Sequence, residues 1–247
     1  MKLEGIVLAG GLGTRLRDTV PGLPKPMAPI AGRPFLSCLL DYLGAEGFDH
    51  IVLSIGHLGT IISDYFDDRY RNIDISYALE SSPLGTGGAT LGAMGQCREN
   101  PFFVINGDTF LAHDYKAMHA RHMAARANFS MAIRDVEDVS RYGRVVLEGD
   151  TPVRLEEKSA AGPGWVNAGV YLFDRSFFAG LHFDGPCSLE RDIIAPGLSR
   201  ANSRAFATSG YFIDIGVPAD YQRAQVELAN PVQAGHTDTS GIPHPAA

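Results

Sequence analysis

The strongest constraint on the fold is an alternation of short apolar runs with longer helical patterns in the first half of the chain. In segment 34–45, for example, apolar residues recur every three or four positions, which is helical spacing. The pattern predicts strands at 5–9, 50–55, 73–79 and 102–105, and helices at 34–45, 58–66, 86–97 and 114–125. Alternating strands and helices at this spacing indicate parallel β-α-β units, and therefore a doubly wound, mostly parallel α/β sheet.

The pattern changes after Asn128, where strands outnumber helices. Strands are predicted at 129–134, 144–147, 152–156, 165–173, 204–208 and 211–215, with helices at 188–195 and 219–229. The second half is therefore expected to add a mixed sheet to the first and form a second lobe. No linker separates the halves, so we expect one domain over 1–230 with parts at about 1–127 and 128–230. Residues 231–247 lack periodicity and are expected to be a disordered tail.

Charge and composition exclude several classes of function. The net charge of the 247 residues is −7, and no Lys/Arg block is present, which argues against nucleic-acid and membrane-surface binding. No run approaches the roughly 18 apolar residues of a membrane helix, so we expect a cytoplasmic protein. Cys38, Cys97 and Cys187 are too scattered for a disulfide framework or a zinc site and are expected to be buried thiols.

A glycine-rich stretch follows the first predicted strand, in the sequence IVLAGGLGTRLRDTVPGLPKPMAPI. Gly10, Gly11 and Gly13 would expose backbone N–H groups at the carboxyl end of the sheet, where open α/β sheets bind ligands. The spacing fits neither a Walker A loop, because no lysine follows directly, nor a dinucleotide fingerprint, because Leu16 stands where a third glycine is required. A phosphate-binding loop and a plain tight turn both remain open.

Two cations and two acids accompany this loop. Arg15 and Lys25 are suited to phosphate oxygens, and the prolines on either side of Lys25 restrict its backbone. Asp108 directly follows a predicted buried strand, a natural position for a Mg²⁺ ligand, although Asn-Gly-Asp is also an ordinary turn. Asp214 lies in the apolar segment YFIDIGVP and needs a partner, which could be a cation in a salt bridge.

Three further segments carry polar groups that could meet a ligand. SPLGTGGAT, at 82–90, begins a helix with small residues that could contact a base or serve close packing, and Glu80 just before it could accept from guanine or be a surface acid. VRLEEKS contains Glu157 and Lys158, which would ordinarily be a solvated surface pair. WVNAGVYLF contains Asn167 and Gly169. The eight histidines form no H-x-x-x-H pair, and none is assigned to catalysis.

The stretch LAGGLGTRLR…LPKPMAPI resembles the signature of the sugar-1-phosphate nucleotidylyltransferases, and the other segments follow in the family's order over about 1–230. The resemblance implies a Rossmann-like sheet of the nucleotidyltransferase type, with nucleotide binding in the first part and sugar binding in the second. It also implies a reaction in which a nucleoside triphosphate and a sugar 1-phosphate give a nucleotide sugar and pyrophosphate.

The resemblance assigns roles residue by residue. The nucleotide would be held by Leu8, Ala9, Gly10, Gly11, Gly13 and Thr14, with Glu80, Gly85 and Thr86 at the base and ribose. Arg15 would hold the β and γ phosphates, and Lys25 would bridge phosphates at the reacting centre. Asp108 and Asp214 would bind Mg²⁺, Lys158 and Glu157 would serve the sugar phosphate, and Asn167 and Gly169 would face sugar hydroxyls.

The segments LPKPMAPIAGRPFLSCLLDYL and ESSPLGTGGA most resemble the branch that joins GTP to D-glycero-α-D-manno-heptose 1-phosphate for surface polysaccharide. Branches that use mannose 1-phosphate with GTP, glucose 1-phosphate with dTTP or N-acetylmuramate 1-phosphate with UTP remain alternatives. A non-catalytic sugar-nucleotide-binding regulatory protein is the alternative from another class, but the retained charged residues favour an enzyme. Homo-oligomer formation is left open.

Overall fold

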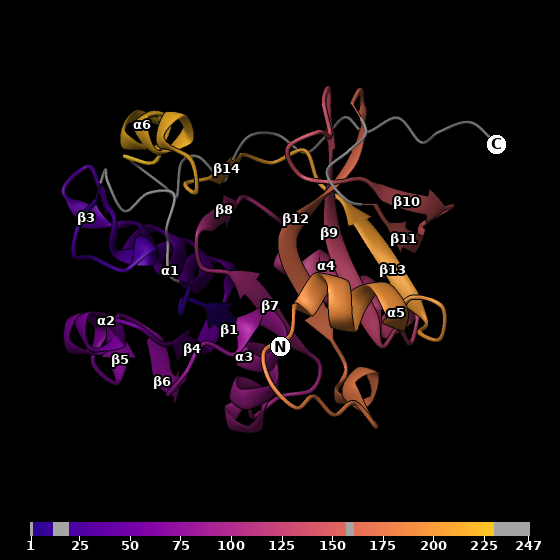
Figure 1. The fold of residues 1–247 in the computed structure, drawn as a ribbon, viewed down its shortest axis with the longest axis horizontal. Helices are drawn as coiled ribbons and strands as arrows, with labels where there is room; N and C mark the ends of the chain where they lie inside the picture. Colours follow the sequence, from indigo (N-terminus) through magenta and orange to yellow (C-terminus); the bar gives the residue numbers. More distant parts are fainter. Residues whose placement is uncertain (1, 12–19, 157–160, 230–247) are drawn as a thin grey trace.

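An eight-stranded sheet runs through the centre of the molecule (Figure 1). The computed structural model describes residues 2–11, 20–156 and 161–229. The strands lie in the order β13-β9-β12-β7-β1-β4-β6-β5. Their bounds are β1 Leu3–Leu8, β4 Phe48–Ile55, β5 Arg69–Tyr70, β6 Ile73–Leu79, β7 Phe102–Asn106, β9 Phe129–Val136, β12 Gly164–Phe173 and β13 Ser203–Ala207.

Strand directions divide the sheet into a parallel and a mixed part. Strands β7, β1, β4 and β6 are parallel, as predicted from the first half of the chain. β12 runs antiparallel to both β7 and β9, whereas β13 is parallel to β9. The predicted α/β class with a mixed-sheet addition is confirmed, and the addition extends the same sheet across β12 because that strand pairs on both of its edges.

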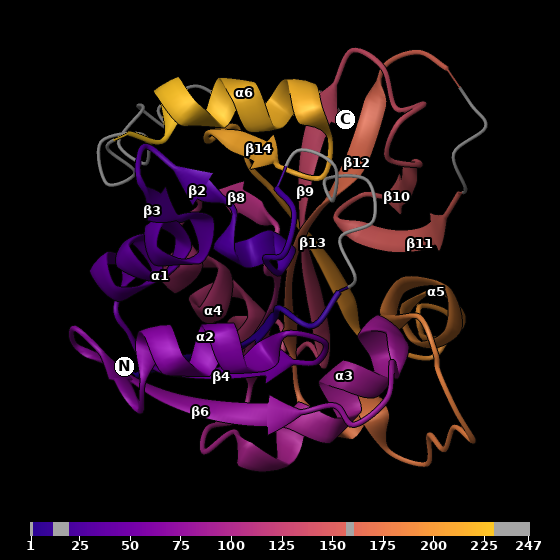
Figure 2. The ribbon, with the colours of Figure 1, turned by 60° about the vertical axis from the view of Figure 1, so that its left-hand side comes forward.

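Helices cover both faces of the sheet (Figures 1 and 2). One face carries α1 Phe35–Glu46, α2 Gly59–Phe66, α4 Tyr115–Ala124 and α6 Pro218–Glu227. The other carries α3 Gly85–Ala93, the π-helix η4 Leu189–Ile194, α5 Ala195–Gly197 and the 3-10 helices η2 Met94–Gln96 and η3 Arg175–Phe178. The smaller elements are η1 Lys25–Met27 (a 3-10 helix) and the strand pairs β2 Pro29–Ile30 with β3 Arg33–Pro34, β8 Thr109–Leu111 with β14 Phe212–Asp214, and β10 Val145–Glu148 with β11 Thr151–Leu155.

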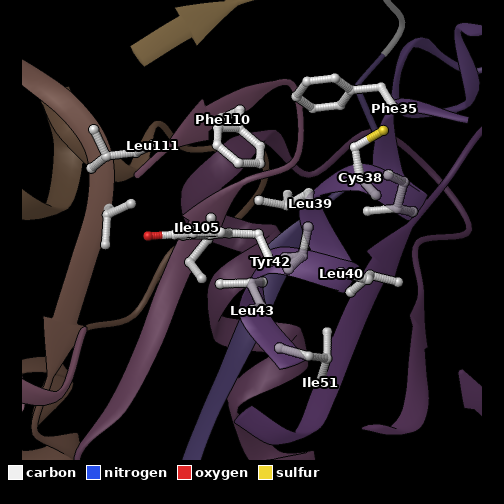
Figure 3. Close-up of a cluster of buried hydrophobic side chains, with 14 of the residues drawn as sticks. Phe35, Cys38, Leu39, Leu40, Tyr42, Leu43, Ile51, Ile105, Phe110 and Leu111 are labelled. Atoms are coloured by element: carbon white, nitrogen blue, oxygen red, sulfur yellow. The ribbon is translucent and has the colours of Figure 1, made fainter. Parts of the chain in front are cut away.

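Each central strand is apolar on both faces because it contributes to two cores. In β7, Phe103 and Ile105 join the core under α1, while Phe102 and Val104 join the core under α3. Figure 3 shows the first of these cores, with side chains of α1 gathered against the sheet. Fully burying each such side chain contributes about 1.5–3 kcal/mol, which makes α1 and β7 central to stability.

The predicted helix at 188–195 is a π-helix rather than an α-helix over most of its length. The N–H of Ala195 donates to the carbonyl of Glu190, five residues earlier. Pro196 follows and has no N–H to continue an α-helical ladder. The wider turn is therefore compatible with the sequence at this end, and π turns are frequent at functional sites.

The three cysteines are buried and unpaired, which confirms their prediction as buried thiols. Burial lowers the pKa of both His113 and His122 to about 4, so these imidazoles are neutral near pH 7. Among the helices of 2–11, 20–156 and 161–229, none has the length and apolar character needed to cross a membrane.

A buried carboxylate, that of Glu4, ties β1 to β4 and to the loop before β7. Glu4 is 2% exposed, accepts backbone N–H bonds from Arg98 at 2.7 Å and Glu99 at 2.6 Å, and pairs with the ring of His50. The other ring nitrogen of His50 lies 2.8 Å from the Ser76 hydroxyl. Burial alone would raise the pKa of Glu4, but its hydrogen bonds outweigh burial and lower it.

Replacing Glu4 by Gln is expected to destabilise the fold by about 2–4 kcal/mol, because the backbone donors lose a charged acceptor. The lowered pKa means that Glu4 stabilises the wild type above about pH 4.3, the ordinary range of glutamate, and that this stabilisation is lost as pH falls through the folded-state pKa. Urea unfolding between pH 3 and pH 7 measures both effects. Glu148→Gln, at an exposed position, is the control, and equal stability of the two variants would contradict the assignment.

Candidate active site

The carboxyl ends of β1, β4 and β6 meet around Gly10. The N–H of Ala9 donates to the carbonyl of Ser54 at 2.8 Å, which continues the pairing of β1 with β4 past the strand end. A Cβ atom at Gly10 would lie 2.8 Å from Glu80 Oε1 and 3.2 Å from the backbone nitrogen of Gly56. A larger residue here would displace the Glu80 carboxylate, and the backbone from Leu8 to Gly11 passes along the edge where ligands bind in open α/β sheets.

Glu80 lies beside this backbone, directly after β6. Its Oε2 accepts a hydrogen bond from the N–H of Leu84 at 3.0 Å, and its Oε1 accepts from the Ser54 hydroxyl at 3.2 Å. A carboxylate has room for about four hydrogen bonds, so this half-buried group keeps acceptor capacity. Two features favour a ligand-binding acceptor over an incidental surface acid: the carboxylate is held in place, and it lies against Gly10.

The two acids singled out in the sequence lie on either side of Lys25. Lys25 Nζ is 2.6 Å from Asp108 Oδ2 and 3.6 Å from Asp214 Oδ1. The lysine side chain is 13% exposed, and those of the two aspartates are 38% and 30% exposed. The salt-bridge partner that Asp214 required is therefore Lys25, and the cluster lies near the surface with its ammonium mostly desolvated.

Strand pairing brings the two acids together. Asp108 is the residue before β8, and β8 pairs antiparallel with β14, in which Asp214 is opposite Thr109. The carbonyl of Asp108 accepts from the N–H of Ile215 at 3.0 Å, which extends the pairing past the strand end. Lys25 begins η1, which is held by a Met27 N–H bond to the Pro24 carbonyl and by the buried side chains of Pro26 and Met27.

The lack of a side chain at Gly216 leaves room for the Lys25 ammonium. A Cβ atom at this position would lie 2.6 Å from Lys25 Nζ and 2.7 Å from Asp214 Oδ1. The N–H of Gly216 also donates to Asp214 Oδ1 at 2.7 Å, which orients that carboxylate. The glycine was not singled out in the sequence, although Asp-Ile-Gly-Val-Pro places it two residues after the acid.

Gly85 and Thr86, expected at the base and ribose, contact another part of the protein in this structure. Gly85 has φ +70° and packs on the carbonyl of Cys187, to which the N–H of Gly87 donates at 2.8 Å. The Thr86 hydroxyl accepts from the N–H of Leu189 at 2.9 Å. Close packing is thus one function of this segment, and its nucleotide contacts stay a prediction.

Asn167 and Gly169 lie at an irregularity where β12 leaves its register with β9. The amide nitrogen of Asn167 donates to the hydroxyl of Tyr171 at 2.7 Å and to Glu190 Oε1 at 2.8 Å. Gly169, at φ +74°, lies directly over the Asn106 amide, which a Cβ would meet at 2.8 Å. The segment of β12 that is expected to meet the sugar therefore lies against Asn106, the last residue of the neighbouring strand β7. Asp108 follows Asn106 by two residues.

Five predicted site residues lie outside the described residues: Gly13, Thr14, Arg15, Glu157 and Lys158. Their roles stay predictions.

The described residues add a cation that the sequence did not single out. Arg141 pairs with Asp220 in the first turn of α6 at 2.7 Å. The hydrogen bond to Asp220 raises the pKa of Arg141, with a smaller contribution from the nearby Asp214 carboxylate. Arg141 follows β9 in an irregular loop with no local motif, so only the fold could reveal it.

The two aspartates fit a magnesium ion by donor type. Mg²⁺ binds through one or two carboxylates and completes its shell with substrate phosphates and water. Among the described residues no group of three or more metal-ligating side chains occurs, which does not conflict with such a site. With Lys25 as the neighbouring cation, the two carboxylates keep one unit of negative charge, which favours a divalent cation.

The chain is similar to proteins of known name over most of its length. Residues 4–230 match the family described as nucleotidyl transferase. The chain is 38% identical over 226 residues to D-glycero-alpha-D-manno-heptose 1-phosphate guanylyltransferase of Aneurinibacillus thermoaerophilus, covering 92% of this chain and 98% of the relative. It is 36% identical over 220 residues to the protein of the same name from Campylobacter jejuni, covering 89% and 97%.

A solved structure shares the fold. The crystal structure of HddC from Yersinia pseudotuberculosis complexed with GMP-PN superposes with a TM-score of 0.79 at 35% sequence identity. The match covers 90% of this chain and 98% of that one.

Replacing Gly216 by Ala is expected to lower turnover by about 10- to 100-fold, because displacing Lys25 by even about 1 Å misplaces the charged group that is predicted to bridge phosphates at the reacting centre. Pyrophosphate release is the readout, and circular dichroism checks the fold. Gly92→Ala in α3 is the matched control, since nothing lies within 4 Å of a Cβ at that position. Wild-type turnover in Gly216→Ala would show that the Lys25 position is not required.

Proposed function

The chain belongs to the nucleotidyl transferase family, and we propose that it transfers GMP from GTP to D-glycero-α-D-manno-heptose 1-phosphate, releasing pyrophosphate. The observation that carries this proposal is the Lys25 ammonium in contact with Asp108 and Asp214, at the same edge of the sheet as the Gly10 backbone, since β1 and β7 are parallel neighbours. The two heptose guanylyltransferases are 38% and 36% identical to this chain, against 31% for the mannose-1-phosphate guanylyltransferase of Mycobacterium tuberculosis, which favours heptose over mannose 1-phosphate as the acceptor. The proposal includes a cytoplasmic location, as expected from the sequence pattern, and a role in surface polysaccharide biosynthesis, as the resemblance implies.

The reaction needs charge neutralisation more than proton transfer. A phosphate oxygen of the sugar 1-phosphate forms a bond to the α-phosphorus of GTP, and the bond from that phosphorus to the oxygen that bridges to the β-phosphate breaks. The attacking oxygen is already anionic, so no general base is required. Negative charge then develops on the departing pyrophosphate, and preorganised cations in a desolvated site stabilise it most effectively.

Among the residues that the structure describes, Lys25 is the cation that we assign to stabilising this charge. Its ammonium is largely shielded from water, which strengthens its interaction with phosphate oxygens. The carboxylates of Asp108 and Asp214 fix the ammonium before substrate arrives, so little reorganisation is needed. In the proposal Arg15 holds the β and γ phosphates and Lys158 the sugar phosphate, as the resemblance implies.

Asp108 and Asp214 are proposed to hold Mg²⁺. A bound Mg²⁺ would supply Lewis-acid stabilisation of charge on phosphate oxygens. Asp214 enters any such site with a fixed orientation, because the Gly216 N–H holds its Oδ1. Asp108 is fixed in turn by its backbone bond to Ile215.

Base selection is assigned to Glu80. Guanine presents N1–H and N2–H donors side by side, which a carboxylate can accept together. Thymine and uracil present one ring donor between two carbonyl oxygens, which a carboxylate repels. A site with a fixed buried acceptor rejects a base that leaves it unpaired. Glu80 has this character, since both of its oxygens are already held by the protein.

Wild-type enzyme is expected to release pyrophosphate fastest with GTP and heptose 1-phosphate in a grid of four nucleoside triphosphates against heptose, mannose and glucose 1-phosphates. Glu80→Gln should lose about 10- to 100-fold in kcat/KM for GTP, the cost of one hydrogen bond to a charged group. The loss with dTTP and UTP should be smaller.

Preference of the wild type for dTTP or UTP would refute the guanylyl assignment. An unchanged kcat/KM in Glu80→Gln would refute only the role of the carboxylate. If none of the sugar 1-phosphates in the grid supports pyrophosphate release, a non-catalytic binding protein would be the better description.

Asp108→Asn and Asp214→Asn are each expected to cost at least about a hundredfold in turnover, comparable to removing one electrostatic catalytic group. Removing divalent cations with EDTA should abolish turnover, and added Mg²⁺ should restore it in the wild type. Asp49→Asn is the control, because Asp49 pairs only with the exposed Lys2 in the described residues. Full turnover in EDTA would show that the two acids serve Lys25 and not a metal.

A further inference from the structure

An exposed carboxylate, that of Glu190, ends a polar chain that begins in the core. The hydroxyl of Tyr171 donates to Glu190 Oε1 at 2.9 Å, and the amide of Asn167 donates to the same oxygen at 2.8 Å. Tyr171 is 1% exposed, whereas Glu190 is exposed. Within 2–11, 20–156 and 161–229, no donor contacts the second oxygen, Oε2. The protein thus fixes one oxygen and leaves the other for a ligand.

The same contacts occupy Asn167, the residue expected to face a sugar hydroxyl. An amide has two N–H groups. Those of Asn167 are directed to Tyr171 and Glu190, and its carbonyl oxygen accepts from the N–H of Gly169 at 3.0 Å. Both N–H groups of Asn167 are therefore used within the protein and orient Glu190, whose Oε2 meets no donor among the described residues.

Glu190 adjoins both of the segments that are expected to bind substrate. The residue before it, Leu189, donates its N–H to Thr86 in the segment expected to bind the nucleotide. Tyr171 and Gly169 belong to the strand expected to bind the sugar, and Gly169 covers Asn106, two residues from Asp108. Burial raises the pKa of Tyr171 well above its ordinary value, with further contributions from the Glu190 and Asp108 carboxylates, so the hydroxyl remains a donor.

We propose that Glu190 is a specificity residue for the acceptor: its Oε2 accepts a hydrogen bond from a hydroxyl of the sugar ring, while Asn167 and Tyr171 position its Oε1. The chemistry selects this ligand group, because a fixed carboxylate accepts from hydroxyls and repels phosphate oxygens. The inference rests on the proposed function, since it requires a sugar 1-phosphate as acceptor, but it does not depend on which sugar is used.

Glu190→Gln tests the contact directly. The variant keeps the size of the side chain and exchanges the charged acceptor for an amide. The KM for the sugar 1-phosphate should rise about 10- to 100-fold, the effect of losing one hydrogen bond to a charged group, while the GTP dissociation constant measured by calorimetry changes less than about twofold. The assay uses the sugar 1-phosphate that the wild type turns over fastest.

A series of monodeoxy analogues of that sugar 1-phosphate separates contact from simple disruption. The wild type should lose a similar factor with one analogue, the one lacking the hydroxyl bound by Glu190. Glu190→Gln should then have similar KM values for this analogue and for the parent sugar, because removing the carboxylate and removing the hydroxyl eliminate the same hydrogen bond. Tyr171→Phe should raise the same KM by a smaller factor and retain discrimination between analogues, as expected of a positioning residue.

Glu227→Gln is the matched control, because Tyr211 donates to Glu227 in α6 at 2.6 Å in the same type of pair. It should leave the sugar KM unchanged. Glu190→Gln could instead raise the KM by the same factor for the parent sugar and for every analogue, or leave the KM unchanged. Either result would overturn this inference and leave the proposed function intact. No wild-type turnover with any sugar 1-phosphate would overturn both. If Glu190→Gln fails to fold, Glu190→Asp, which withdraws the carboxylate by one methylene, is subject to the same comparison.

Discussion

The contact of Lys25 with Asp108, with Asp214 as second neighbour, is the interaction on which the arrangement of the candidate site depends. It joins the segment after β1, the end of β7 and the strand β14, which lie far apart in the sequence. The charges neutralise one another only in part, so the cluster keeps a net negative charge that favours a divalent cation. Gly216 makes the approach possible, because any larger residue would occupy the space of the ammonium.

We propose that two further carboxylates, those of Glu80 and Glu190, give the proposed phosphate-binding site its selectivity. Each is held by donors of the protein and retains acceptor capacity toward the site. Negative groups do not increase affinity for anionic substrates. They reject ligands that cannot donate to them, because a fixed acceptor left unpaired is costly. In this interpretation the cations bind the phosphate groups that all such substrates share. Glu80 then distinguishes one base from others, and Glu190 distinguishes one sugar from others.

Sequence reasoning was most successful where the signal is local. The strand at 73–79 and the helix from Phe35 follow from periodicity, and the lone cysteines from their spacing. The short β8–β14 pair was missed in part because three-residue strands carry little periodicity and are defined by a partner far along the chain. The contact of Glu190 with Tyr171 was missed because no local motif marks it, and the π-helix because its apolar spacing does not distinguish it from an α-helix.

The late position of β14 in the chain has a consequence for biosynthesis. Lys25 and Asp108 emerge from the ribosome well before Asp214, and the parallel strands β1, β4, β6 and β7 can form while the rest of the chain is still being made. Until β14 pairs with β8, Lys25 lacks its second carboxylate, and the edge of β8 remains unpaired. A nascent chain can therefore acquire most of its sheet and remain inactive until β14 has emerged and paired with β8.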